Sequence, residues 1–136
     1  MSVPIPPPAG FLQAFFCEKL LGDLTNNFSR AEFACRCGCG LACVAPELVF
    51  LLQQVRDVLA VPIRVVESSR CECQDLRVGG AHGNRYRAGD AADIVAEGIE
   101  LKLLADTARR VARQGWLVKE ERQFVHIERD CESRPR

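Results

Sequence analysis

The stretch Tyr86-Arg87-Ala88-Gly89-Asp90-Ala91-Ala92-Asp93-Ile94-Val95 decides the fold. Its second half, residues 91–95, is small or apolar apart from one aspartate, and it predicts a strand. Residues 68–86, which lead into this stretch, hold three glycines and predict an irregular loop. A loop of that length is uncommon in a small domain and indicates a functional surface. We therefore expect a functional surface next to this strand.

The segments on either side alternate between helical and extended patterns. Ser29 and Glu32 have the spacing of a capping box, Pro46 suits the first turn of a helix, and Gly115 suits the position after a helix. Apolar residues at helical spacing predict the other helical bounds, and β-branched runs predict the strands. The predicted helices are 11–24, 30–33, 46–60 and 100–114, and the predicted strands are 63–67, 91–95, 116–119 and 123–128.

Length and charge limit the class of protein. The chain has 136 residues, which fits one domain, assigned to residues 11–130, with an extended proline-rich arm at 1–10 and a tail at 131–136. Lys+Arg and Asp+Glu balance at 18 each, which argues against a nucleic-acid partner. No segment is long and apolar enough to span a membrane. The first ten residues lack the pattern of a secretory signal, so we expect synthesis in the cytoplasm.

The chain has eight cysteines, a high count for its length. An even count favours disulfides, whereas the lack of a secretory signal argues against an oxidising compartment. These two indications conflict, so the sequence leaves the redox state open. Six of the cysteines fall in two segments, namely Cys35, Cys37, Cys39 and Cys43 in the first and Cys71 and Cys73 in the second.

Five segments carry a resemblance to a known family, and they follow one another in the family's order. They are 27–40 (Asn-Phe-Ser-Arg-Ala-Glu-Phe-Ala-Cys-Arg-Cys-Gly-Cys-Gly), 68–71 (Ser-Ser-Arg-Cys), 78–81 (Val-Gly-Gly-Ala), 89–94 (Gly-Asp-Ala-Ala-Asp-Ile) and 124–128 (Phe-Val-His-Ile-Glu). Together they resemble the zinc D-Ala-D-Ala carboxypeptidases and related peptidoglycan endopeptidases, in their small phage and bacterial members. The resemblance implies an α+β fold in which a small antiparallel sheet packs against helices.

The resemblance also implies where the site residues lie. Such enzymes hold a catalytic zinc with a His, an Asp seven residues later and a His on a late strand, and leave a fourth position for water. Asp93 and His126 match the second and third of these ligands. Arg70 matches an arginine that binds substrate or stabilises developing charge, and Glu128 is the best candidate for the general base.

Tyr86 stands where the family has its first zinc-binding histidine. A zinc ion on Asp93 and His126 would need either His82 or Tyr86 as its third ligand, and a phenol with a pKa near 10 is an uncommon one. The alternative is that Asp93 and His126 form a hydrogen-bonded pair without metal. Further departures from the family pattern are Glu67, Gln74, Asp75 and Gln123.

The resemblance includes both cysteine segments, so we expect them to lie close together. A disulfide or mixed pairing between the two segments is the first prediction, a structural metal held by thiolates is the second, and reduced, half-buried thiols are the third. Cys17 and Cys131 are expected to be free or paired with each other.

Two functions follow from the resemblance. The Tyr86 replacement favours a degenerate member that serves as a structural or binding protein, such as a component of a phage particle. Its partners would be peptidoglycan stem peptides or particle proteins, with the arm as a contact in a homo- or hetero-oligomer. The alternative is an active zinc peptidase that cleaves stem peptides. Either would reach a cell wall at lysis or as part of a phage particle.

Overall fold

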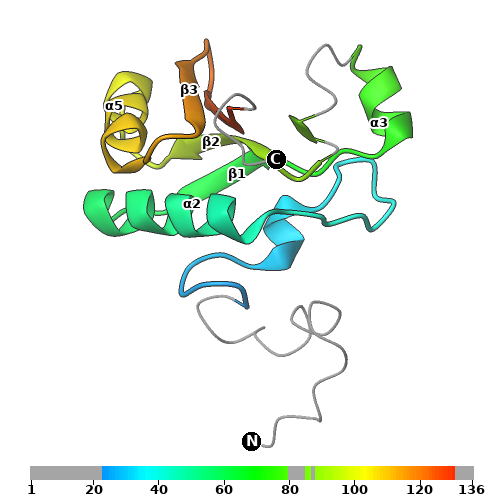
Figure 1. Cartoon of the computed structure of the whole chain (residues 1–136), viewed down its shortest axis with the longest axis horizontal. Helices are drawn as coiled ribbons and strands as arrows, with labels where there is room; N and C mark the ends of the chain where they lie inside the picture. Colours follow the sequence, from blue (N-terminus) through cyan, green and yellow to red (C-terminus); the bar gives the residue numbers. More distant parts are fainter. Residues whose placement is uncertain (1–22, 80–84, 87, 131–136) are drawn as a thin grey trace, which may run out of the picture.

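The computed structural model describes residues 23–79, 85–86 and 88–130 (Figure 1). Several predictions therefore lie outside the described residues. They concern the arm at 1–10, nearly all of the helix predicted over 11–24, the tail at 131–136, and the side chains of Cys17, His82 and Cys131.

A four-stranded antiparallel sheet forms the centre of the domain. Its strands are β1 (Ile63–Glu67), β2 (Ala91–Ala96), β3 (Trp116–Glu120) and β4 (Val125–Arg129), in the order β1-β2-β4-β3. All four were predicted from the sequence to within about two residues at each end, as expected of β-branched and apolar runs. The α+β class and the antiparallel sheet are confirmed.

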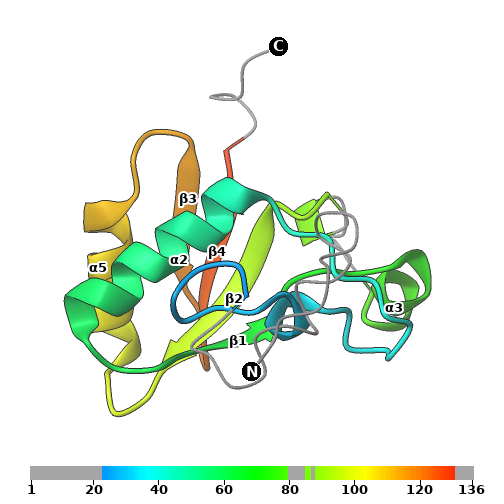
Figure 2. The ribbon, with the colours of Figure 1, turned by 90° about the horizontal axis from the view of Figure 1, so that it is seen from below.

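Two long helices cover one face of this sheet. They are α2 (Pro46–Leu59) and α5 (Leu101–Val111), which pack against each other, and α5 also packs on β2 and β3. Figures 1 and 2 show both helices toward one end of the molecule. The core between helices and sheet is fully apolar and includes Leu48, Leu52, Val55, Ile94, Leu104, Ala108, Val125 and Ile127.

The alternation of side chains along β2 and β4 separates an apolar face from a polar one. Ala92 and Ile94 of β2 and Ile127 of β4 point into the core. Their neighbours Asp93 and His126 must point to the opposite face, because successive side chains of a strand alternate. The sheet thus presents its polar groups on the side away from α2 and α5.

Two shorter elements lie beyond β1. The 3-10 helix η1 (Arg30–Phe33) forms where the capping box predicted it, and the backbone N–H of Ser29 donates to Oε2 of Glu32 at 2.8 Å. The helix α3 (Glu72–Arg77) lies at the end of the molecule opposite α5 in both views (Figures 1 and 2). No helix among the described residues has the length and apolar character needed to cross a membrane.

The helix α3 corrects the prediction of an irregular loop over 68–86. It begins because the side chain of Cys71 accepts a hydrogen bond from the backbone N–H of Gln74, and because Glu72 and Asp75 place negative charge in its first turn. Cysteine is not among the usual N-cap residues, so no local pattern indicates that a helix starts here. The predicted helix over 100–114 is also shorter than expected, since Ala112 already has extended backbone.

Candidate functional site

The register of the sheet aligns four polar residues in a row across it. Asp93 of β2 lies opposite His126 of β4, and His126 in turn lies opposite Lys119 of β3. On the other side, Glu67 at the end of β1 is paired with Asp93 after a local irregularity of the strand. The row brings together the two residues that the sequence singled out as metal ligands.

The hydroxyl group of Tyr86 sits against both of them. It lies 2.9 Å from each carboxylate oxygen of Asp93 and 3.0 Å from Nδ1 of His126. Nδ1 of His126 is itself 2.7 Å from Oδ1 of Asp93. The three residues are only 4–5% exposed, so they form a closed, buried triangle of hydrogen-bonding groups.

A tight turn after Tyr86 aims its side chain at the sheet. Gly89 donates its backbone N–H to the carbonyl oxygen of Tyr86 at 3.2 Å, and its own carbonyl accepts from Ala45 at 2.9 Å. Gly89 has φ +78°, and a Cβ atom there would lie 2.8 Å from the carbonyl oxygen of Cys43. The turn therefore requires glycine both for its backbone conformation and for its close approach to the segment before α2.

His126 is bound through both ring nitrogens. Nδ1 meets Asp93, and Nε2 lies 2.8 Å from Oε1 of Glu128, two residues further along the same strand face. Burial lowers the pKa of His126, but the hydrogen bonds with Asp93 and Glu128 outweigh that effect and raise it above its ordinary value. An imidazolium between two carboxylates is the arrangement that these contacts favour.

The phenol of Tyr86 is held in its neutral form. Burial raises its pKa first, and the neighbouring charge and hydrogen bond of Asp93 raise it further. A neutral phenol is a poor ligand for zinc, and its oxygen lies 2.9 Å from each carboxylate oxygen of Asp93, the group that a metal would need. Among the described residues, Tyr86, Asp93 and His126 therefore do not fit a catalytic zinc ion.

Arg70 packs over the ring of Tyr86. Its guanidinium lies 3.8 Å from the centre of the Tyr86 ring, and it donates to Glu67 at 2.9 Å and to Asp75 at 3.2 Å. Burial lowers the pKa of Arg70, but these two carboxylates more than compensate and raise it. The structure thus brings the predicted arginine to the site, where two acidic residues that depart from the family pattern hold it in place.

The site opens to solvent on the β3 side, where a pocket of about 190 Å³ borders Tyr86 and His126. Its other lining residues are Lys119, Glu121 and Phe124. These three were not predicted from the sequence. Lys119 lies directly opposite His126 through the register of β3 and β4, and no sequence pattern indicates that register. Gln123, predicted as a departure at this pocket, is instead exposed.

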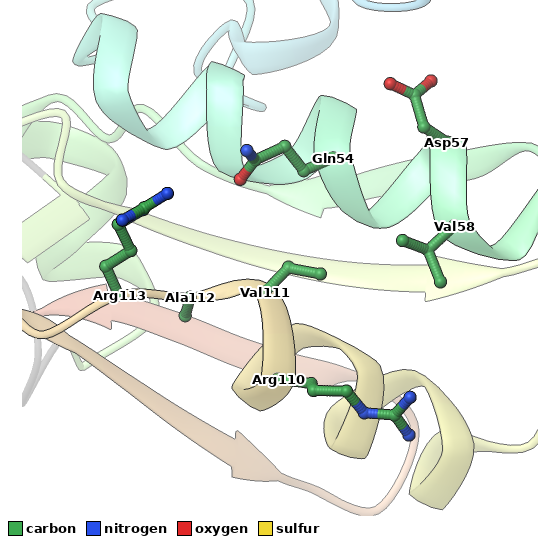
Figure 3. Close-up of a pocket in the computed structure, with 7 residues that line it drawn as sticks. All are labelled: Gln54, Asp57, Val58, Arg110, Val111, Ala112 and Arg113. Atoms are coloured by element: carbon green, nitrogen blue, oxygen red, sulfur yellow. The ribbon is translucent and has the colours of Figure 1, made fainter.

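A wider hollow of about 550 Å³ lies elsewhere, between α2 and the end of α5. Figure 3 shows the lining residues Gln54, Asp57 and Val58 on α2 and the segment from Arg110 to Arg113 below it, with the Asp57 carboxylate directed away from that segment. It lies on the helical side of the sheet, away from Tyr86, and it has no cluster of buried polar groups. We therefore place the candidate site at the Tyr86 pocket.

The cysteines form a second cluster. The predicted proximity of the two segments is confirmed, because Sγ of Cys71 lies 3.7 Å from that of Cys35 and 3.5 Å from that of Cys37. The predicted disulfide is not formed, since the six cysteines of the described residues are all free thiols. Hydrogen bonds from the backbone of Gln74 and from the thiol of Cys37 lower the pKa of Cys71 to about 7.

Two further residues near the sheet, the acidic Asp90 and the aromatic Trp116, have structural partners. Asp90 is buried against Arg129 and Arg85, at 3.4 and 4.0 Å. Trp116 packs against the edge of the core, with the guanidinium of Arg129 4.7 Å from its ring centre. Gln74, a further departure, is buried on α3.

Comparisons with known proteins agree with this architecture. A family profile described as Peptidase M15 matches residues 26–128. Among solved structures, the chain is similar to the Serratia marcescens L-Ala D-Glu endopeptidase ChiX, with 25% sequence identity and a TM-score of 0.50. That similarity covers 65% of this chain and 82% of the other. A search of curated proteins found no match.

Proposed function

The chain belongs to the peptidase M15 family, and from that premise we propose that it is a member without catalytic zinc whose fold binds peptidoglycan stem peptides. The observation that carries this proposal is the position of the Tyr86 hydroxyl group, within 3.0 Å of both Asp93 and Nδ1 of His126. The groups that would bind zinc in a peptidase are here bound to a phenol and to each other.

The energetics of ligation support the loss of the metal. A catalytic zinc takes three protein ligands, and this site offers an Asp, a His and a buried phenol whose pKa is raised. Binding the metal would require ionisation of that phenol or its displacement from a buried position, with the loss of its hydrogen bonds. Both routes oppose zinc binding at this site.

The pocket beside the site supports a peptide ligand. Lys119 is exposed at the pocket mouth, where its ammonium group can meet a carboxylate, and Phe124 supplies apolar surface. The solved relative is an L-Ala D-Glu endopeptidase, so its substrate carries an acidic residue. A stem peptide that contains L-Ala and D-Glu is therefore the ligand we assign to this pocket.

Calorimetric titration with a purified stem peptide tests the binding. We expect Lys119→Ala to weaken binding about tenfold, as for the loss of one charge-assisted contact. Lys102→Ala is the matched control, because Lys102 is exposed on α5, which covers the opposite face. Equal affinities of both variants and the unchanged chain, or no binding at all, would count against the assignment.

A gain of metal binding tests the role of Tyr86. Tyr86→His restores the family's ligand set, so we expect this variant to bind zinc in addition to any bound by the unchanged chain, measured by elemental analysis. Tyr86→Phe removes the hydroxyl without adding a ligand and is expected to gain none. The proposal fails if the unchanged chain cleaves stem peptides in a zinc-dependent reaction that His126→Ala abolishes.

A further inference from the structure

Four cysteine side chains converge at one point beside α3. Their sulfur atoms, from Cys35, Cys37, Cys39 and Cys71, all lie within 4.8 Å of one another. They come from two segments 36 residues apart in sequence, the loop after η1 and the start of α3, which lie side by side in both views (Figures 1 and 2). One loop supplies three of the four thiols, and the fold brings the fourth, from Cys71, to them.

The distances among three of these sulfur atoms are close to those of a tetrahedral metal site, and the fourth, from Cys39, lies within 4.8 Å of each of them. Cys35 to Cys37 is 3.5 Å, Cys37 to Cys71 is 3.5 Å, and Cys35 to Cys71 is 3.7 Å. Four sulfurs bound to zinc at about 2.3 Å lie about 3.8 Å apart. A disulfide needs two sulfurs at about 2 Å and would leave the other two without a role.

Backbone groups point at the sulfurs, as they do in built metal sites. The backbone N–H of Cys71 donates to Sγ of Cys35 at 3.4 Å, and that of Gln74 donates to Sγ of Cys71 at 3.4 Å. The backbone N–H of Leu41 lies 3.5 Å from Sγ of Cys39. Three of the four sulfurs thus accept a backbone hydrogen bond, which favours the thiolate form that binds metal.

The loop that carries three of the cysteines is fixed to the sheet independently of any metal. Arg36 reaches across to the edge strand β1, where Nη2 donates to the carbonyl of Val65 at 2.7 Å and Nε to that of Val66 at 2.9 Å. Gly38, with φ +88°, turns the chain between Cys37 and Cys39. The four sulfurs are therefore held in place by contacts of the fold.

We propose that Cys35, Cys37, Cys39 and Cys71 bind one zinc ion as a closed structural site. Four thiolates in a tetrahedron are the ligand set that zinc prefers, and they leave no position for water or substrate. The short distances between sulfurs fit a single metal ion. Cys43 and Cys73 are exposed and lie outside the cluster.

This zinc would also support the arrangement of Arg70 and Tyr86 on the polar face of the sheet. Cys71 directly follows Arg70, whose guanidinium covers the Tyr86 ring, and Asp75 of α3 holds that guanidinium. A metal bound to Cys71 would fix the start of α3 and with it the position of Arg70 over the Tyr86 ring. The site is a structural device, separate from the Asp93 and His126 pair.

Elemental analysis of the full chain, purified under reducing conditions without chelators, tests the site. We expect one zinc per chain, lost in Cys37→Ser and in Cys71→Ser. Cys73→Ser and Cys43→Ser are matched controls from the same two segments and should keep the metal. His126→Ala should keep it too, which separates this site from any zinc at Asp93 and His126.

A second measurement covers the case in which the cysteine variants do not fold. Replacement of the zinc by Co²⁺ in the unchanged chain should produce the sulfur-to-cobalt charge-transfer bands and intense visible bands of a tetrahedral thiolate site. A chain that holds no zinc and gives no such bands would overturn the proposal. So would iron in place of zinc, loss of zinc in Cys73→Ser with retention in Cys37→Ser, or a disulfide among the four thiols detected by mass.

Discussion

Tyr86 makes three short contacts with the two groups that would bind a catalytic metal. In our proposal this one residue decides whether the fold can bind a catalytic metal. With a histidine at this position, the family has a complete ligand set. Here the buried phenol supplies hydrogen-bond partners to Asp93 and His126 instead.

The ionisation of Tyr86 can be measured directly, because it is the single tyrosine of the chain. Burial and the charge of Asp93 raise its pKa above the ordinary value of about 10. In an ultraviolet absorbance titration we expect no phenolate until the protein unfolds at alkaline pH. A phenolate signal at neutral pH, induced by added zinc, would show instead that Tyr86 is a metal ligand.

The raised pKa of His126 predicts how the free energy of unfolding depends on pH. Its folded pKa is raised above the ordinary value of 6.5 by Asp93 and Glu128, despite burial. The folded state thus binds the proton more tightly than the unfolded state does. The protonated His126 therefore adds to the free energy of unfolding in full below about pH 6.5, and this contribution is lost as pH rises through the folded pKa. Urea unfolding from pH 5 to 9 should show this decline.

The matched comparison for this pH effect is His126→Asn. This variant removes the titrating ring and is expected to flatten the decline in unfolding free energy above pH 6.5, although it lowers stability overall. If the unchanged chain and the variant lose stability in parallel over this range, other groups cause the decline, and the imidazolium bridge is not the favoured state.

At the scale of elements, the turn that ends at Gly89, just before β2, contacts the segment that leads into α2. The backbone N–H of Ala45 donates to the carbonyl of Gly89. Gly89→Ala places a Cβ 2.8 Å from the carbonyl oxygen of Cys43 and strains a backbone with φ +78°. We expect a loss of about 1–3 kcal/mol in unfolding free energy, measured by urea unfolding.

Gly98→Ala is the control for Gly89→Ala. It also has a positive φ, of +74°, but open space around its Cβ position. Gly98→Ala should therefore lower the free energy of unfolding only by the cost of the strained backbone conformation, about 1 kcal/mol. An equal loss in the two variants would mean that the contact with Cys43 does not matter.

The sequence predicted the strands and the long helices well because each has a strong local pattern. The strand over 63–67 consists largely of β-branched residues, and Pro46 marks the start of α2. The helix α3 was missed because its cap is the side chain of Cys71, whose role depends on the cysteines around it. Local patterns do not contain such information.

The site was predicted in part, and the limits are physical. Asp93, His126, Glu128, Arg70 and Tyr86 do meet, as the resemblance implied. That the Tyr86 hydroxyl bonds both Asp93 and His126 follows only from the geometry of the turn at Gly89. Lys119 joins the pocket through the register of β3 and β4, which a sequence pattern does not fix.

At the scale of the whole molecule, the domain divides into an apolar side and a polar side. The helices α2 and α5 and their core account for the fold, and they lie on one face of the sheet. The Tyr86 pocket lies on the other face, toward β3 and β4, whereas the cysteine cluster lies beyond β1 at the start of α3. The chain has the peptidase framework. In our account it binds zinc at the cysteine cluster, where the metal is structural, and not at Asp93 and His126, where it would be catalytic.

Anomalous diffraction at the zinc absorption edge, from crystals of the full chain grown with excess zinc, tests this account most directly. The account predicts one strong anomalous peak at the sulfurs of Cys35, Cys37, Cys39 and Cys71. It predicts none between Asp93 and His126, where the Tyr86 hydroxyl should be seen instead. A peak bound to Asp93 and His126, with the Tyr86 side chain displaced or ligating, would contradict it.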